Sequence, residues 1–250
     1  MVKNGAPAIF KLLANNLRWN ILGHLTHSDM RVQELSALLH QPQNLVSYHL
    51  HKLHEHGLIV EHRSIADGRE VYYGVNWGQI RNEFKTTETE LHPGLVADPG
   101  AARSFFPYRV LFLCTHNSAR SQMAEGFLRD KSHHQIQALS AGTDPLPVHP
   151  NAIQVMAEHQ IDIHGQQSKG LEAFLSQQFD YVITVCDLAR ESCPTFPGNP
   201  VQIHWSIADP VSPSGASENH LQTFRATAAE LEERVDYFLF GIRPAGKADP

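Results

Sequence analysis

The chain has 250 residues, a formal net charge of −6 at neutral pH and three cysteines. This length predicts two domains, each large enough to bury its own core. The few cysteines exclude a disulfide-stapled secreted domain, no apolar run has membrane length, and the first residues show no signal-peptide pattern. We therefore expect a cytoplasmic protein that keeps its thiols reduced and makes no use of a membrane.

The first hundred residues form a module without cysteine that holds nine of the 17 histidines. Apolar residues between positions 12 and 25 recur at helical spacing, and a short helix is indicated around residues 32–39. A further helix is predicted for residues 43–55, ended by Gly57 as its C-cap. Strands are predicted at 58–60 and 71–75, and one more helix runs from Trp77 to about His92. The turn between the strands can project as a wing.

This module resembles a winged helix-turn-helix repressor of the ArsR type, through residues 17–22, 34–35, 46–50, 53–59 and 68–73. The resemblance implies a homodimer that binds operator DNA through this domain, with a recognition helix in the major groove. The candidate contacts on that helix and on the wing are Gln43, Asn44, Ser47, Tyr48, His51, Lys52 and Arg69. An interaction module that kept the fold and lost DNA binding is the alternative.

The net charge of this module does not favour DNA binding, because residues 1–100 hold nine Lys+Arg against ten Asp+Glu. His51 and His54 can share a helical face, so a metal site is a second use for the histidines. Sensors of the ArsR type often present Cys-Val-Cys at the start of the third helix, where this chain has Arg31-Val32-Gln33. Any response to arsenic must come from elsewhere, or the inducer differs.

The composition breaks at residues 97–107, where Asp98-Pro99-Gly100 interrupts any periodicity. We place the first domain at residues 1–96, a linker at 97–107, the second domain at 108–240 and a disordered tail at 241–250. The second domain is predicted to be a parallel sheet flanked by helices. Its functional loop should lie at the carboxyl end of the first strand.

That first strand ends in a C-x5-R-S loop. Its residues are Cys114, Thr115, His116, Asn117, Ser118, Ala119, Arg120 and Ser121. Backbone N–H groups of such a loop, together with the start of the next helix near Ser121, can surround one tetrahedral oxyanion. The same donors are expected to lower the pKa of the Cys114 thiol, so that the thiolate is the nucleophile. The planar guanidinium of Arg120 suits a further pair of oxyanion oxygens.

The other two cysteines, Cys186 and Cys193, follow a short predicted strand at residues 181–185, in a loop or short helix. With Cys114 they suit a relay in which a disulfide forms and moves by thiolate attack. Their spacing alone leaves open that both are small buried hydrophobic residues.

From about residue 108 to 239 the chain resembles a thioredoxin-coupled arsenate reductase of the low-molecular-weight tyrosine phosphatase superfamily. The resemblance rests on the C-x5-R-S loop, the C-x6-C pair and the run ending in Asp209-Pro210. It implies that Cys114 is the nucleophile, Arg120 the oxyanion clamp and Asp209 the general acid. Asn117 would brace the loop, Cys186 and Cys193 would be the resolving thiols, and thioredoxin would be the external reductant, with no cofactor. The substrate would be arsenate or a phosphate-like oxyanion.

A tyrosine phosphatase of the same fold is the nearest alternative. Such enzymes typically carry a second Cys in the loop, where this chain has Ala119, and aromatic residues after Asp-Pro, where it has Val211. An oxyanion or redox sensor is the other alternative, although sensing would not need Asp209. Some reductases bind a monovalent cation near the loop; here Lys169 follows Ser168, so an ammonium can take that role and no metal is implied.

Overall fold

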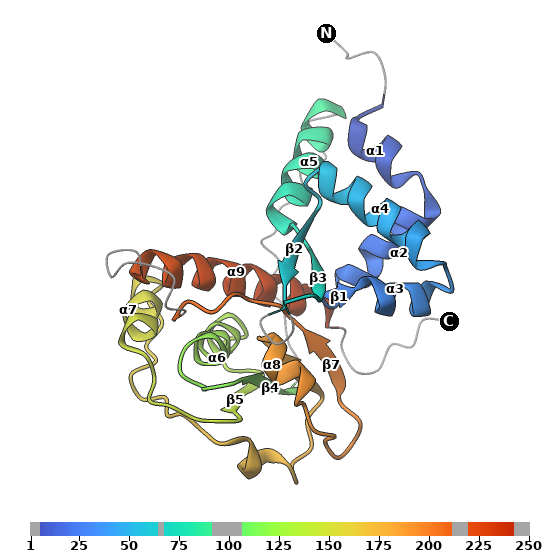
Figure 1. Cartoon of the computed structure of the whole chain (residues 1–250). Coiled ribbons are helices and arrows are strands. Elements are labelled where there is room, and N and C mark those ends of the chain that lie inside the picture. The colour runs from blue at the N-terminus through green and yellow to red at the C-terminus, as the bar shows by residue number, and fades with distance from the viewer. Residues whose placement is uncertain (1–5, 65–67, 92–106, 212–219, 243–250) are drawn as a thin grey trace. The chain divides into compact units, whose positions relative to one another are not determined.

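The computed structural model describes residues 6–64, 68–91, 107–211 and 220–242 (Figure 1). The chain divides into two compact units, residues 1–103 and 104–250. Most of the predicted linker, 97–107, and most of the predicted tail, 241–250, lie outside the described residues. Within the described parts, no helix is both long and apolar enough to cross a membrane.

The first unit is mainly helical and carries a small antiparallel sheet in the order β1-β3-β2. Its elements in chain order are α1 (Ala8–Leu13), α2 (Asn16–Leu25), β1 (Met30–Arg31), α3 (Val32–Leu39), α4 (Gln43–Glu55), β2 (Ile59–Arg63), β3 (Val71–Val75) and α5 (Trp77–Leu91). The predicted helix 43–55 and strand 71–75 are confirmed in position. The first strand of the hairpin lies slightly later than predicted, and β1 was not predicted.

The first helical stretch is divided by a cap that apolar spacing does not reveal. The Asn15 side chain accepts hydrogen bonds from the backbone N–H groups of Leu17 and Arg18, each at 3.1 Å. Asn is among the preferred N-cap residues, so α2 begins anew after α1 has ended. After α4, the C-cap is His56 and not the predicted Gly57, which follows it with φ +70, a left-handed conformation that favours glycine.

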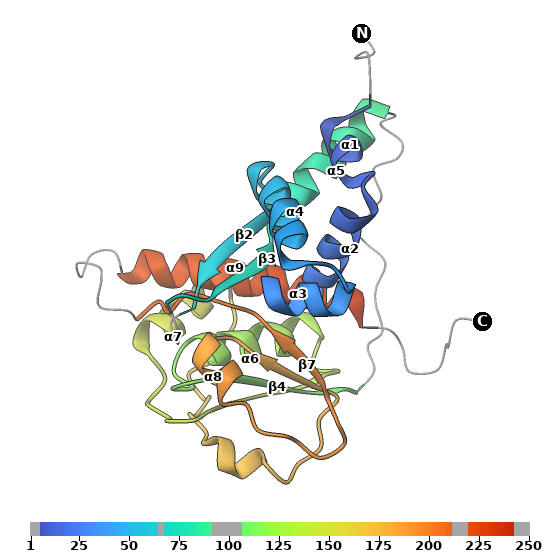
Figure 2. The same ribbon diagram turned by 45° about the vertical axis from the view of Figure 1, so that its right-hand side comes forward.

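The hairpin of β2 and β3 pairs Ile59 with Val75 and Arg63 with Val71. The core beneath it contains fully buried Ile21, Leu35 and Leu50. Helices α2 to α4 followed by this hairpin give the predicted winged helix-turn-helix architecture (Figure 2).

The second unit is a four-stranded parallel sheet in the order β5-β4-β6-β7. Its elements are β4 (Arg109–Cys114), α6 (Arg120–Lys131), β5 (Gln137–Gly142), α7 (Pro150–Glu158), the 3-10 helix η2 (Leu171–Phe174), β6 (Tyr181–Thr184), α8 (Asp187–Glu191), β7 (Val201–His204) and α9 (His220–Gly241). Helices α6, α7 and α9 pack against one another beside the sheet (Figure 1). The predicted fold class is confirmed.

The central strand β4 places the functional loop. Val110, Leu111 and Phe112 are fully buried, because parallel strands are covered on both faces. In parallel strands the carboxyl ends meet at one edge of the sheet, so Cys114, which ends β4, and Cys186, which follows β6, come to the same edge.

Candidate active site

The loop between β4 and α6 is wrapped around the Cys114 thiol. The backbone N–H of Asn117 donates to Cys114 Sγ at 3.1 Å, and Ser121 Oγ lies 2.9 Å from the same sulfur. Cys114 is 3% exposed. Helix α6 begins at Arg120, one residue before the predicted start. The loop therefore presents hydrogen-bond donors to the sulfur from two positions.

Backbone carbonyl groups of the loop accept hydrogen bonds from residues outside the loop. The oxygens of Thr115, His116 and Ser118 accept hydrogen bonds from the N–H groups of Asp144, Leu146 and His149, at 2.9, 2.9 and 2.8 Å. Because the C=O and N–H of a trans peptide point in opposite directions, the N–H groups that follow these carbonyls face the interior of the loop. This is the arrangement that an oxyanion-binding loop needs.

Asn117 joins the loop to the rest of the domain. It adopts φ +45, and its Nδ2 donates to Ser121 Oγ at 2.9 Å and to Ser140 Oγ at 2.8 Å. Its Oδ1 accepts from the N–H of Lys169 at 2.7 Å and from Gln122 Nε2 at 3.0 Å. The bracing role expected for Asn117 thus has a direct geometric basis.

A second layer of polar contacts lies behind Asn117. Glu125 Oε2 accepts from Ser140 Oγ at 2.6 Å and lies 3.1 Å from Lys169 Nζ. The Glu125 side chain is only 7% exposed, so the Lys169 ammonium balances a buried charge. Gln122 and Glu125 were not singled out from the sequence, although polar residues on the buried side of a helix are a usable signal.

The Cys114 thiol is subject to opposing effects. Burial is the largest effect and raises its pKa, while the Arg120 charge and the Ser121 hydrogen bond lower it; the nearby Cys186 raises it further. The net direction is upward. The prediction of a lowered pKa is wrong for this conformation, because complete removal from water outweighs the donors that the loop supplies.

Arg120 and Asp209 face each other across the loop. Arg120 Nη2 donates to Asp209 Oδ2 at 2.9 Å, and Arg120 Nη1 donates to the carbonyl of Ile207 at 3.0 Å. The Arg120 side chain is 7% exposed and that of Asp209 is 29% exposed. The predicted clamp and the predicted acid are therefore brought together in one site, with the acid on the more open side.

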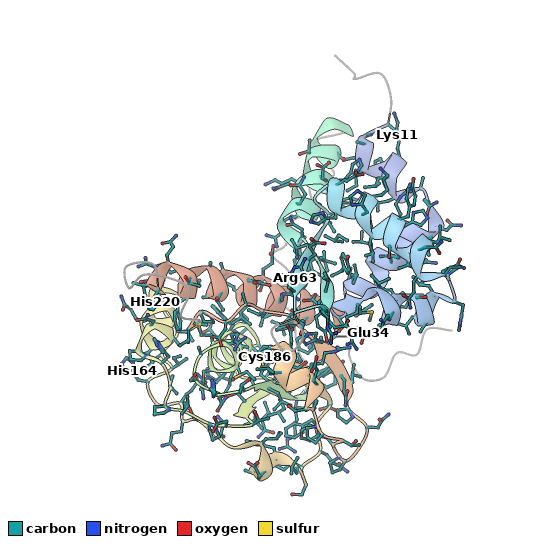
Figure 3. All side chains as sticks on the ribbon, in the orientation of Figure 1. Lys11, Glu34, Arg63, His164, Cys186 and His220 are labelled. Atoms are coloured by element: carbon teal, nitrogen blue, oxygen red, sulfur yellow. The ribbon has the colours of Figure 1, made fainter. Side chains whose placement is uncertain are left out.

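The second cysteine lies beside this loop and the third lies farther along the chain. Cys186 is buried and caps the N-terminus of α8, where its Sγ accepts from the N–H of Ala189 at 3.4 Å (Figure 3). Its sulfur lies 3.5 Å from Thr115 Oγ1. Cys193 follows α8 and is half-buried, and burial raises the pKa of its thiol despite the nearby Arg190. All three thiols are free.

The candidate DNA contacts lie on α4 and at the wing. Gln43, Asn44, Ser47, Tyr48 and His51 are exposed on α4, Lys52 is half-buried there, and Arg69 is exposed beside the wing. Glu55, overlooked in the sequence, lies 3.1 Å from His51 Nε2 and 2.7 Å from Lys52 Nζ. Among the residues that the structure describes, no group of three or more His, Cys, Asp or Glu is placed to hold a metal.

Two families match the chain. Residues 109–247 match the low molecular weight phosphotyrosine protein phosphatase family, which covers more than half of the chain, so the chain belongs to that family. Residues 15–70 match the MarR family. The predicted combination of a helix-turn-helix domain with a phosphatase-like domain is confirmed, whereas the narrower ArsR type stays a prediction.

Individual relatives match about half of this chain and nearly the whole of their own length. An arsenate reductase of Halalkalibacterium halodurans is 38% identical over 129 residues, which are 52% of this chain and 93% of the relative. A glutaredoxin arsenate reductase of Synechocystis is 36% identical over 134 residues, 54% of this chain and 98% of the relative. A solved arsenate reductase in the phosphate binding state is 35% identical with a TM-score of 0.44, covering 54% of this chain and 99% of that one.

Proposed function

We propose that the chain is a bifunctional protein, an arsenate reductase joined to a DNA-binding transcriptional regulator. The observation that carries the first activity is the placement of Cys186 at the rim of the Cys114 loop, 3.5 Å from Thr115 Oγ1. A phosphatase of this fold needs the loop, Arg120 and Asp209, but no second thiol at the rim. The relatives named arsenate reductase support the same choice.

The reaction uses the three thiols in turn. The Cys114 thiolate attacks the arsenic of arsenate while Asp209 protonates the departing hydroxide, and Arg120 holds two of the remaining oxygens. The Cys186 thiolate then attacks Cys114 Sγ. The new S–S bond forms as the S–As bond breaks, and its electron pair stays on arsenic, which leaves as arsenite. Attack of Cys193 on Cys186 frees Cys114 and leaves a Cys186–Cys193 disulfide.

The ion pair of Arg120 with Asp209 fits the start of this sequence. An incoming oxyanion competes with the Asp209 carboxylate for Arg120. Once displaced, Asp209 no longer pairs with Arg120 and is free to serve as the general acid. Binding of the substrate therefore prepares the acid.

Arsenite production by the purified chain, measured with each cysteine replaced in turn, tests the relay. Cys114→Ser should abolish turnover, and Arg120→Ala should nearly do so. Cys193→Ser should complete one round and stop with a Cys114–Cys186 disulfide, found by peptide mapping. Arsenite formation by Cys114→Ser would show that the mechanism is wrong.

The external reductant is expected to be thioredoxin. The Synechocystis relative is named a glutaredoxin arsenate reductase, so the alternative reductant has to be compared directly. Arsenate-dependent oxidation should be followed with thioredoxin and its reductase in one reaction and with glutaredoxin and glutathione in another. Turnover supported by glutaredoxin alone would exclude the thioredoxin-coupled form.

Phosphotyrosine hydrolysis is the second candidate, favoured by the family to which the chain belongs. It requires Cys114, Arg120 and Asp209 and neither resolving thiol. Brisk aryl phosphate hydrolysis, with no disulfide after one equivalent of arsenate, would favour the phosphatase. In that case the second unit would act on phosphate esters, or serve the regulator as a sensor of oxyanions or of redox state.

The regulatory activity rests on the exposed polar face of α4 and on the match to the MarR family. We infer that the first unit forms a homodimer and binds a roughly palindromic operator, with α4 in the major groove and Arg69 at the backbone or minor groove. A gel shift of the full chain on DNA upstream of its own gene tests this. Failure to bind any such DNA would favour an interaction module.

A further inference from the structure

A buried contact between a histidine and a carboxylate lies directly behind the second cysteine. His204 Nε2 is 3.3 Å from Asp187 Oδ1, and the two side chains are 1% and 4% exposed. The other ring nitrogen, His204 Nδ1, is 2.9 Å from Thr184 Oγ1. Ser206 Oγ donates to Asp187 Oδ1 at 2.8 Å. This cluster joins the ends of β6 and β7 to the first residue of α8.

His204 therefore contacts the chain on both sides of Cys186. Thr184 is two residues before the cysteine, and Asp187 is the residue after it. His204 thus holds the chain two residues before Cys186 and one residue after it. The Sγ of Cys186 itself caps α8 and lies near Thr115 Oγ1. The direction of this sulfur toward the Cys114 loop thus depends on the cluster.

Stability alone is a weak reason for such a pair. Taking a carboxylate and an imidazole out of water costs about as much free energy as their contact returns, and an apolar pair of similar volume is often equally stable. What such a polar contact adds is a single preferred geometry for the groups that it joins. Here those groups are the two strand ends and the helix start that surround a thiol.

The other end of α8 is built differently. Leu188 is 45% exposed, Glu191 and Ser192 are exposed, and Cys193 is half-buried. The segment between Cys186 and Cys193 consists of the five residues of α8, Asp187–Glu191, and its C-cap Ser192. The anchored end of that segment is Asp187.

We propose that Asp187 and His204 are positioning residues for the resolving step. They hold the Cys186 thiol for attack on Cys114 Sγ. The inference rests on the proposed function, and it assigns the pair to one step of the relay, not to oxyanion binding.

The test measures one disulfide in a Cys193→Ser background, where the relay stops at Cys114–Cys186. After one equivalent of arsenate, Asp187→Asn should slow formation of this disulfide roughly tenfold or more, since small misplacement of a reacting group is costly. Alkylation of Cys114 by iodoacetamide should change by less than about twofold. Glu191→Gln removes the same charge from the exposed end of α8 and should leave both rates unchanged.

Three further variants keep the proposal testable if Asp187→Asn folds poorly, which the urea midpoint reports. His204→Gln should slow the disulfide as Asp187→Asn does, and the double variant should be no slower than either single one, because both remove the same interaction. Thr184→Val removes the contacts of the Thr184 hydroxyl to His204 Nδ1 and to the Ile203 carbonyl, leaves the contact between His204 and Asp187, and should slow the step less. Additive losses in the double variant would overturn the pairing of the two residues.

A second oxidant separates this proposal from the proposed function. Diamide, an azo compound, oxidises two thiols to a disulfide and is itself reduced to the hydrazine, so it needs no arsenate chemistry. If arsenate fails while diamide forms Cys114–Cys186 and Asp187→Asn slows that reaction, the reductase assignment is wrong and the positioning role stands. Disulfide formation at the parent rate in Asp187→Asn, or equal slowing of Cys114 alkylation, would overturn the positioning role.

Discussion

At the scale of single residues, the Cys114 thiol is governed by a balance between burial and hydrogen bonding. Burial raises its pKa, and the Ser121 hydroxyl is one of the groups that lower it. Ser121→Ala should raise the pKa of Cys114 further, so that alkylation of this thiol requires a higher pH. The pH dependence of iodoacetamide labelling, read at the Cys114 peptide, measures the change, with exposed Ser192→Ala as the control. A shift of the labelling profile to lower pH in Ser121→Ala would contradict the role assigned to the Ser121 hydroxyl.

Gly142 is a second position where one residue decides the shape of the loop. A Cβ there would lie 2.6 Å from the carbonyl oxygen of Thr115 and 2.8 Å from the backbone nitrogen of Asn117. Both are backbone atoms, so Gly142→Ala must displace the loop. We expect a loss of stability of about 1–3 kcal/mol, typical of overpacking, and a marked loss of activity. Urea unfolding measures the first, and Gly165→Ala, which meets nothing within 4 Å, is the matched control.

At the scale of elements, Lys169 connects the segment before η2 with α6. Its ammonium faces the buried carboxylate of Glu125, and its backbone N–H binds Asn117. Lys169→Met keeps the length of the side chain and leaves Glu125 without this cation. The cost should be roughly 1–3 kcal/mol of unfolding free energy. Adding Glu125→Gln to Lys169→Met should recover part of the lost unfolding free energy, as denaturant titrations measure it. If the double variant instead lost the sum of the two single losses, the two side chains would be shown to act separately.

A carboxylate on helix α4 is expected to weaken DNA binding. Glu55 contacts His51 and Lys52, two of the candidate DNA contacts on this helix, and its negative charge offsets that of the Lys52 ammonium. Glu55→Gln should tighten operator binding and steepen its salt dependence by about one phosphate contact. Titrations at several salt concentrations measure both quantities. Glu191→Gln changes the net charge equally, but in the second unit, and should have no such effect.

At the scale of the whole molecule, the distribution of thiols limits how arsenic can reach the regulator. The first unit contains no cysteine, and arsenite binds thiolates. If arsenite releases the full chain from its operator, it should do so through Cys114, Cys186 and Cys193. A full-length variant with all three replaced by Ser should bind the same DNA and ignore arsenite in a gel shift. Release of that variant by micromolar arsenite would place the sensor among other residues.

Much of this protein could be predicted from local signals in the sequence. The strand before Cys114, the C-x5-R-S loop and the helix after it follow from residues adjacent in the chain, and the structure reproduces them within one residue. Helix α4 and strand β3 were predicted in position for the same reason, since apolar periodicity and a following glycine are local. The division of the first helical stretch at Asn15 was missed, because one capping side chain leaves the apolar spacing unchanged.

What only the tertiary structure decided depends on residues distant in the chain. The sequence determined which thiols exist and which loop can hold an oxyanion. It did not determine the sign of the Cys114 pKa shift, because desolvation depends on how completely the folded chain covers the sulfur. Nor did the sequence show that Glu125 lies behind Asn117, or that His204 contacts a residue on each side of Cys186. Those contacts join α6 to β5, and β7 to β6 and α8, and they exist only once the parallel sheet has formed.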